Sequence, residues 1–309
     1  MGFFFQNYSF ATIVTFIVLV AGLMLFNEIT RRSKIASLIA YGIIPVILVI
    51  GILSGFVDTP SSRTWFGTVK TFSALAGVWG FLLIRYNDKV GKSKFAWYFP
   101  ALILAINIAE AVFKDLEVFN TFKTLTVDAA GLTVLGGSWN VMNAIAGIIN
   151  ILTLTGWMGI MVAKSKSKDM VWADQLWFWI IAYDVWNIAY CYNCISTRSM
   201  YSGMALILSC TLAEVIFKHG VWLQHRAQTL ALFGMFSLFV DYQSSPLFGI
   251  TASYRPEAWF TLSFAALVIN CAVLAYEIYV IVKYRRNPLK EELYSHLGAY
   301  KRNKAVNGL

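Results

Sequence analysis

The feature that most constrains this chain is a series of nine long apolar segments. A bilayer core about 30 Å thick needs roughly 20 apolar residues of helix, because lipid offers the backbone no hydrogen-bond partners. The segments lie at about 10–29, 35–56, 66–85, 95–113, 139–163, 175–195, 201–217, 229–240 and 259–282. They predict an all-α, polytopic bundle of about nine membrane-spanning helices. The eighth is the weakest, and we expect it to be tilted, extended by the polar residues before it, or only partly inserted.

The composition supports a membrane protein over a soluble one. The 309 residues are 58% hydrophobic and only 13% charged, against about 25% charged residues in soluble domains, and the mean hydropathy is +0.63. This much apolar surface cannot be buried inside one globule of this size, which excludes a disordered chain and a soluble enzyme. The net charge of +9 is therefore attributed to anionic lipid, and we expect no nucleic-acid partner.

The basic residues alternate between the links that join the segments. Lys and Arg concentrate in the first, third and fifth links and in the tail, and cytoplasmic loops carry such an excess. This pattern predicts an external N-terminus, a cytoplasmic C-terminus, one transmembrane domain at 1–288 and a basic cytoplasmic tail at 289–309. The link 115–138 is half apolar, so we expect either an external loop or a re-entrant segment there.

One stretch of the chain is repeated. ALILAINIAEAVFK at 101–114 aligns with ALILSCTLAEVIFK at 205–218, with eight of fourteen positions identical. The predicted topology gives the two copies opposite orientations, as in the inverted repeats of secondary transporters. The alternative is a coincidence of helix composition, and the single motif leaves both open.

Asp184 is the strongest candidate for a functional residue. It falls near the middle of the sixth segment, where an ionisable group costs at least about 2.5 kcal/mol and needs a partner, a wet cavity or a function. Helical spacing places Trp177 and Asn187 on its face, beside an aromatic stripe that includes Tyr183 and Trp186. We expect a polar floor for a small ligand or a proton carrier. A purely structural Asp, hydrogen-bonded to a neighbouring helix, is the alternative.

The repeated carboxylates Glu110 and Glu214 form the second candidate set. Each precedes a Lys by four residues, so an i,i+4 ion pair near the interface is one interpretation. The functional interpretation places both glutamates in one cavity, with Asn107 one turn before Glu110. Lys70 lies close to a helix start, where we expect its amine to extend to the outer surface.

The motif Cys191-Tyr-Asn-Cys194 is formally a CxxC, the signature of thiol redox sites. It lies at the C-terminal end of a segment, where the helix dipole disfavours thiolate, which favours coincidence. The chain has no Walker A, HExxH or GxSxG motif and no paired-His spacing, so we expect no metal site, and no cofactor is identified.

Two stretches carry a resemblance. WADQLWFWIIAYDVWNIAYCYNC at 172–194 and GVWLQHRAQTLAL at 220–232 resemble the signature of an uncharacterised family of bacterial multi-span membrane proteins. The resemblance implies the bacterial inner membrane and no established activity. From the residues, the leading hypothesis is a secondary transporter or solute-binding protein for a small organic molecule, with coupling to protons through Glu110 or Glu214. The alternative is a membrane-embedded enzyme, such as a thiol/disulfide oxidoreductase that uses Cys191 and Cys194.

Overall fold

The computed structural model describes residues 2–242 and 244–309, and these are mostly helical. The helices are α1 Phe10–Arg32, α2 Lys34–Leu38, α3 Ile44–Leu53, α4 Trp65–Tyr86, α5 Asp88–Gly91, α6 Tyr98–Thr121, α7 Ser138–Leu152, α8 Trp177–Cys194, α9 Leu206–Ile216, α10 Trp222–Phe239, α11 Pro256–Tyr284 and α12 Gly298–Ala305. π-Helical turns at Ile39–Ile43 and Met200–Ala205 join α2 to α3 and lead into α9. The strands, two residues each, are β1 Phe5–Gln6, β2 Thr126–Val127, β3 Thr133–Val134, β4 Met161–Val162, β5 Met170–Val171 and β6 Thr251–Ala252.

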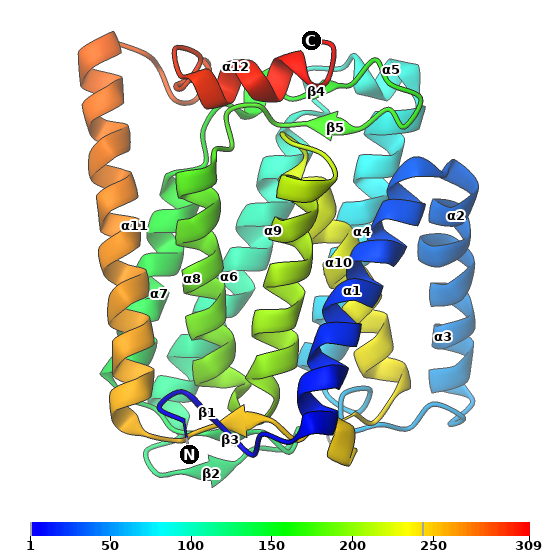
Figure 1. The fold of residues 1–309 in the computed structure, drawn as a ribbon, viewed down its shortest axis with the longest axis vertical. Coiled ribbons are helices and arrows are strands. Elements are labelled where there is room, and N and C mark those ends of the chain that lie inside the picture. Colours follow the sequence, from blue (N-terminus) through cyan, green and yellow to red (C-terminus); the bar gives the residue numbers. More distant parts are fainter. Residues whose placement is uncertain (1, 243) are drawn as a thin grey trace.

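The long helices lie side by side in one bundle, and the strands lie at its two ends (Figure 1). Neighbouring packing pairs are α4 with α10, α6 with α7, and α11 with both α7 and α8. The hairpin β4–β5, α5 and α12 cover one end, which is the upper end in Figure 1. The hairpin β2–β3 and the pair β1–β6 occupy the lower end, together with the N-terminus.

Every apolar segment predicted from the sequence contains a helix, but fewer helices meet the requirements of a span. In the described part of the chain, four are long and apolar enough to cross a membrane: Phe10–Arg32, Lys34–Leu53, Gly67–Tyr86 and Pro256–Tyr284. The helices Ser138–Leu152 and Met200–Ile216 are apolar but shorter. Charged residues interrupt α6, and polar residues begin α10. The helical class is therefore confirmed, while the count of nine spans and their orientation stay predictions.

Three boundaries differ from those predicted. The helix in the fifth segment ends at Leu152 rather than 163, because Gly156 turns the chain in the left-handed region (φ 68°) and β4 follows. The helix in the fourth segment continues to Thr121, so the link expected at 115 begins as helix. The eighth segment is extended by the preceding polar residues, since α10 begins at Trp222.

Local signals fix the other helix starts. Ser9 caps α1, since its hydroxyl accepts from Thr12 N while Thr12 Oγ1 accepts from Ser9 N, a capping box. Thr64 caps α4, and Pro256 takes the first position of α11, where a missing N–H costs nothing. These residues fix where α1, α4 and α11 begin.

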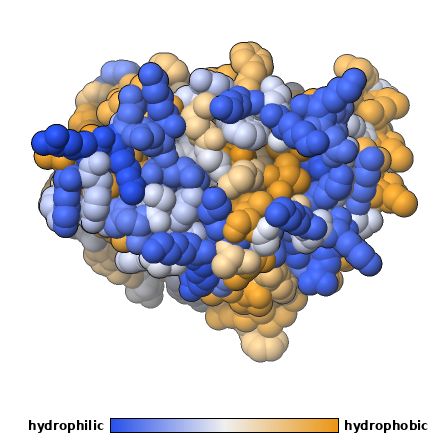
Figure 2. All heavy atoms as spheres, turned by 90° about the horizontal axis from the view of Figure 1, so that it is seen from above, coloured by the Kyte–Doolittle hydropathy of each residue, from blue (hydrophilic) through white to orange (hydrophobic). Residues whose placement is uncertain are grey.

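The sides of the bundle are apolar and its upper end is polar. Large apolar side chains are exposed along α1, α3 and α11, among them Ile17, Val46, Ile50, Phe264 and Val282. Figure 2, seen from above, shows hydrophilic residues gathered on the upper end and hydrophobic residues around its rim. Soluble monomers rarely expose continuous apolar surface of this extent, so the sides are suited to lipid.

The N-terminal strand β1 pairs with β6, which is distant in sequence. In the β1–β6 ladder Phe5 pairs with Ala252 and Gln6 with Thr251. The Tyr192 hydroxyl at the end of α8 donates to Phe4 O and contacts Ser253. The lower end of the bundle is thus held by three segments that are distant in sequence.

Candidate functional site

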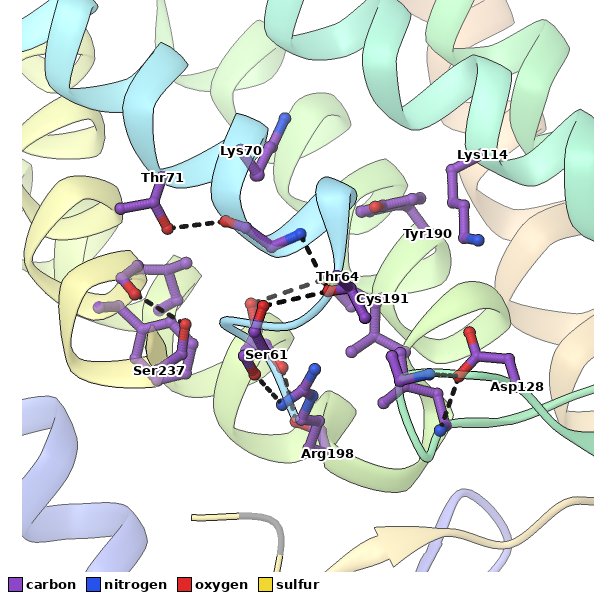
Figure 3. Close-up of a pocket in the computed structure, with 18 of the residues that line it drawn as sticks. Ser61, Thr64, Lys70, Thr71, Lys114, Asp128, Tyr190, Cys191, Arg198 and Ser237 are labelled. Atoms are coloured by element: carbon purple, nitrogen blue, oxygen red, sulfur yellow. Dashed lines mark hydrogen bonds between the residues drawn. The ribbon is translucent and has the colours of Figure 1, made fainter. Parts of the chain in front are cut away.

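The principal cavity has a volume of about 370 Å³ and extends from the lower end of the bundle into its interior. α4, α6, α8 and α10 supply its walls, and the loops around residues 61–64, 128–132 and 195–198 surround its mouth (Figure 3). This volume is at the small end of the range for drug-sized ligands. Its polar and charged lining residues include Arg63, Lys70, Thr71, Lys114, Glu117, Asp128, Asn187, Tyr190, Cys191, Arg198, Ser202, Arg226 and Ser237.

Helix α10 shows how deep the cavity reaches. Ser237, near the lower end of α10, and Arg226, in its first turns, both line the cavity. They are eleven residues apart, which is about 16 Å of helix. Arg226 also lines a second, small cavity of about 30 Å³ with Asn107 and Tyr183. Arg226 is therefore at the inner limit of the principal cavity.

Arg226 is a buried cation without an acidic partner. Only 4% of the residue is exposed. Its Nε donates to Tyr183 Oη at 3.3 Å, and the guanidinium lies 5.8 Å from the centre of that ring. Among the described residues, no carboxylate lies within 4 Å of it, and its Nη1 has no hydrogen-bond partner. Buried charges are usually paired, so this guanidinium is equipped to bind something that enters the cavity.

Two polar atoms of α8 face the same space. Asn187 and Tyr190 are three residues apart and therefore lie on one face of the helix. Both are buried, and neither Asn187 Oδ1 nor the Tyr190 hydroxyl has a partner in the described part of the chain. An unsatisfied buried polar group costs about 1–3 kcal/mol. The cavity therefore offers an amide and a phenol in addition to the guanidinium.

Asp184 does not line this cavity, although Asn187 does. One of its oxygens, Oδ2, accepts from Thr211 Oγ1 at 2.7 Å, and Trp222 Nε1 donates to the same hydroxyl at 3.0 Å. Its other oxygen, Oδ1, has no partner among the described residues. The residue is thus buried as expected, but it lies behind the cavity wall and bonds to α9.

The aromatic residues predicted around Asp184 are divided between several environments. Trp177 is 62% exposed on the outside of the bundle, so it does not form part of a polar floor. Tyr183 accepts from Arg226, and the Trp186 indole donates to Asn143 O at 3.0 Å. Of this group, Tyr183 has the direct contact with the cavity cation.

Lys70 and Glu110 form an ion pair at the cavity rather than at the surface. Lys70 Nζ lies 3.0 Å from Glu110 Oε2 and donates to Asn107 O at 2.9 Å. The expected extension of Lys70 to the outer surface is therefore wrong. The i,i+4 pair of Glu110 with Lys114 is also not formed, since Lys114 pairs with Glu117. Lys70 brings Glu110 and Asn107 within reach of the cavity wall.

Glu214, the repeated counterpart of Glu110, has a different environment. Its carboxylate accepts from the backbone amides of Gly220 and Val221, at 2.5 and 3.0 Å, and closes the turn between α9 and α10. Lys218 binds Val306 O instead of Glu214. Glu110 and Glu214 do not share a cavity, so the sequence repeat is not matched by a repeat of contacts.

A family model of proteins of unknown function, DUF5692, matches residues 6–306. The chain belongs to this family. The expectation of an uncharacterised family is thereby confirmed, and no activity follows from membership. No curated protein and no solved structure matches the chain.

Asp115 of the DUF5692 chain is a buried acid that the sequence analysis assigned to a link. It is fully buried in α6 and accepts hydrogen bonds from Asn143, Asn140 and Asn193 at 2.7, 2.9 and 3.3 Å. The i,i+3 spacing of Asn140 and Asn143 on one helix face was the available signal. This cluster joins α6, α7 and α8 and satisfies the carboxylate, which is the pattern of a structural centre.

The two cysteines of the CxxC motif have separate partners. Cys191 Sγ contacts Ser202 O at 3.6 Å and lines the cavity, whereas Cys194 Sγ donates to Asp115 Oδ1 at 3.4 Å. Both are buried free thiols. In the described residues, no group of three or more His, Cys, Asp or Glu is arranged to hold a metal ion.

A second polar cluster closes the upper end of the bundle. Asp169 Oδ2 lies 2.7 Å from Arg31 Nη1, while Gln224 Nε2 donates to Asp169 Oδ1 at 2.9 Å. Burial alone would raise the pKa of Asp169, but the charge of Arg31 and the hydrogen bonds hold it below its ordinary value. His225, in the first turn of α10, is fully buried and contacts Asn27 at 2.7 Å. This Asp169 cluster therefore closes the bundle at the end opposite the mouth of the principal cavity.

Proposed function

We propose that this DUF5692 protein is an integral membrane protein that binds a small organic molecule in the principal cavity and acts as a secondary transporter. The observation that carries the proposal is a cavity that penetrates about 16 Å and ends at buried polar atoms without partners. Such atoms are costly unless a ligand or water satisfies them. The apolar helices and the polar upper end of the bundle support the membrane setting.

The charge pattern gives the cavity a direction. The basic links gather at the upper end, which the positive-inside rule assigns to the cytoplasm of a bacterium. The mouth at the lower end then opens outward, and the Asp169 cluster lies between the cavity and the cytoplasm. In this proposal the structure corresponds to an outward-open state, and transport requires the Asp169 cluster to separate.

The candidate residues take distinct roles in this proposal. Asn187 contacts the solute directly because it lines the cavity. Glu110 is the better of the two repeated acids for proton coupling, since it reaches the cavity through Lys70, whereas Glu214 is engaged with a backbone turn. Asp184 acts behind the wall through Thr211.

The test is uptake of a labelled pool of small metabolites into proteoliposomes. Ser237→Trp places a bulky ring in the cavity and should reduce uptake at least tenfold. Phe239→Trp is the matched control, because Phe239 lies on the same helix but is exposed on its outer side. Equal uptake by both variants, with both folded, would contradict the proposal.

A further inference from the structure

Some of the cationic side chains that line the cavity are paired with carboxylates and others are not. Arg63 is paired with Asp58 at the surface, Lys70 with Glu110 and Lys114 with Glu117. Arg198 and Arg226 form no ion pair within 4 Å in the described part of the chain. Arg198, half-buried near the mouth, donates to Ser61 Oγ at 2.9 Å and lies 5.2 Å from the Tyr242 ring centre. Asp128, which also lines the cavity near its mouth, offsets the charge of Arg198 there, so the uncompensated positive charge of the cavity lies at its inner end, at Arg226.

Asp184, a buried acid of α8, does not pair with Arg226. Asp184 lies on the facing helix α8, but its hydrogen bond goes to Thr211. Arg226 is left with one neutral contact, the Tyr183 hydroxyl. Arg226 is buried, and a buried guanidinium needs a negative charge close by, because desolvation costs several kcal/mol and a neutral oxygen recovers little of it.

We propose that the solute is an organic carboxylate, whose carboxyl group binds the Arg226 guanidinium and whose apolar body lies between α8 and α10. The proposal rests on the function proposed above and specifies its substrate class. Arg matches a carboxylate through two parallel N–H donors, which a single neutral ligand oxygen cannot use.

The other lining residues fit the same ligand. The Tyr190 hydroxyl can donate a hydrogen bond to a ligand oxygen, whereas Asn187 Oδ1 accepts and suits a donor group on the body of the ligand. Leu206, Leu230 and Phe233 give the cavity an apolar wall. A phosphate dianion would require more donors than this single buried cation supplies, so the chemistry favours one carboxyl group.

The test compares carboxylates with their own amides as ligands of the purified protein. Benzoate and hexanoate are measured against benzamide and hexanamide by the shift in thermal unfolding midpoint, with apparent Kd values from titration. At least one carboxylate should bind tenfold or more tightly than its amide. Arg226→Gln should remove that preference, whereas Arg32→Gln, at an exposed arginine outside the cavity, should retain it.

A second measurement covers the event that Arg226→Gln does not fold. Wild-type protein is treated with phenylglyoxal, and modification of Arg226 and Arg32 is followed by peptide mass spectrometry. Benzoate should slow the modification of Arg226 severalfold and leave that of Arg32 unchanged, while benzamide should protect neither.

Two results would overturn the proposal. The first is amides that bind as tightly as their carboxylates in the cavity, which would leave the solute-binding function intact and remove only the charge requirement. The second is a panel in which no carboxylate is preferred and Arg226 is not protected. Loss of uptake in Ser237→Trp with no carboxylate preference separates failure of this proposal from failure of the function.

Discussion

At the scale of single residues, buried polar groups divide into those that are satisfied and those that are not. Asp115 is surrounded by three amide donors, whereas Arg226, Asn187 and Tyr190 keep atoms without partners in the described part of the chain. The first pattern stabilises a fold, and the second is costly unless a ligand contributes. Replacing an acid of the first kind should therefore change stability, whereas replacing one with an unpaired oxygen should change function.

Replacing Asp115 should impair stability. Asp115→Asn turns one acceptor into a donor that faces the amide donors of Asn140 and Asn143, so a buried donor loses its partner. We expect a loss of about 2 kcal/mol or more in the free energy of unfolding, seen as a lower thermal midpoint in detergent. Glu117→Gln, with a partly exposed side chain on the same helix, is the control and should change little.

Replacing Asp184 should impair function. Asp184→Asn keeps the size of the side chain and an acceptor for Thr211, so the protein should fold and insert. We expect uptake to fall at least tenfold, because the titratable group behind the cavity wall is lost, while carboxylate binding at Arg226 should be retained. Full activity in a folded variant would remove Asp184 from the mechanism.

Some of these residues could be predicted from the sequence, and others could not. Asp184 and Asn187 were visible because a carboxylate inside an apolar run is conspicuous. Asp115 was concealed because the run was ended at Phe113, although α6 continues to Thr121. Arg226 was read as part of a polar flank, since its burial depends on α4 and α8, which the sequence of α10 does not specify.

At the scale of elements, hydropathy located helices well and their ends poorly. The segment 139–163 was predicted as one span because Met161 and Val162 are apolar, yet they form β4 after the turn at Gly156. A strand that pairs across a short hairpin satisfies its backbone locally, so apolar composition alone does not require a helix.

The C-terminal segment depends on one acid at the upper end. Asp174 accepts from the backbone amides of Leu293 and Tyr294 at 3.0 and 2.8 Å, and Tyr300 of α12 is buried nearby. Burial raises the pKa of Asp174 to about 6, although the two backbone hydrogen bonds lower it. The folded protein thus holds this proton more tightly than the unfolded chain does, and stability from this group is lost as pH rises from about 4 to about 6.

The pH dependence of C-terminal docking should therefore report Asp174. Limited proteolysis of residues 289–309 should be slower at pH 4.5 than at pH 7 in the wild type. Asp174→Asn removes the titrating group. The difference in proteolysis rate between wild type and variant should therefore change between about pH 4 and about pH 6 and stay constant above that range. Asp169, whose pKa is lowered, has the opposite sign: its contribution is present above its ordinary pKa and is lost in stronger acid. A wild type and variant with parallel pH profiles would contradict the assignment.

At the scale of the whole molecule, the two ends of the bundle differ in charge and in their hairpins. The bundle and its helical class were predictable, because apolar runs and basic links are features of composition. The arrangement of helices around the cavity was not predictable. It depends on pairings such as α4 with α10, between residues more than a hundred positions apart.

The orientation of the bundle is testable in cells. In a Cys271→Ser background, Thr126→Cys in β2 and Lys92→Cys after α5 place exposed thiols at opposite ends. A membrane-impermeant thiol reagent should label position 126 in intact cells and position 92 only after lysis. The reverse labelling would invert the topology and place the cavity mouth at the cytoplasmic face.

The ladder between β1 and β6 has a consequence for biosynthesis. Gln6 donates to Ala252 across 246 positions, so the first strand has no partner until almost the whole polypeptide has left the ribosome. The lower end of the bundle is therefore completed late in synthesis, once β6 is available to pair with β1. A truncated product that ends before β6 would leave its own beginning unanchored, which gives quality-control proteases an exposed end at which to start.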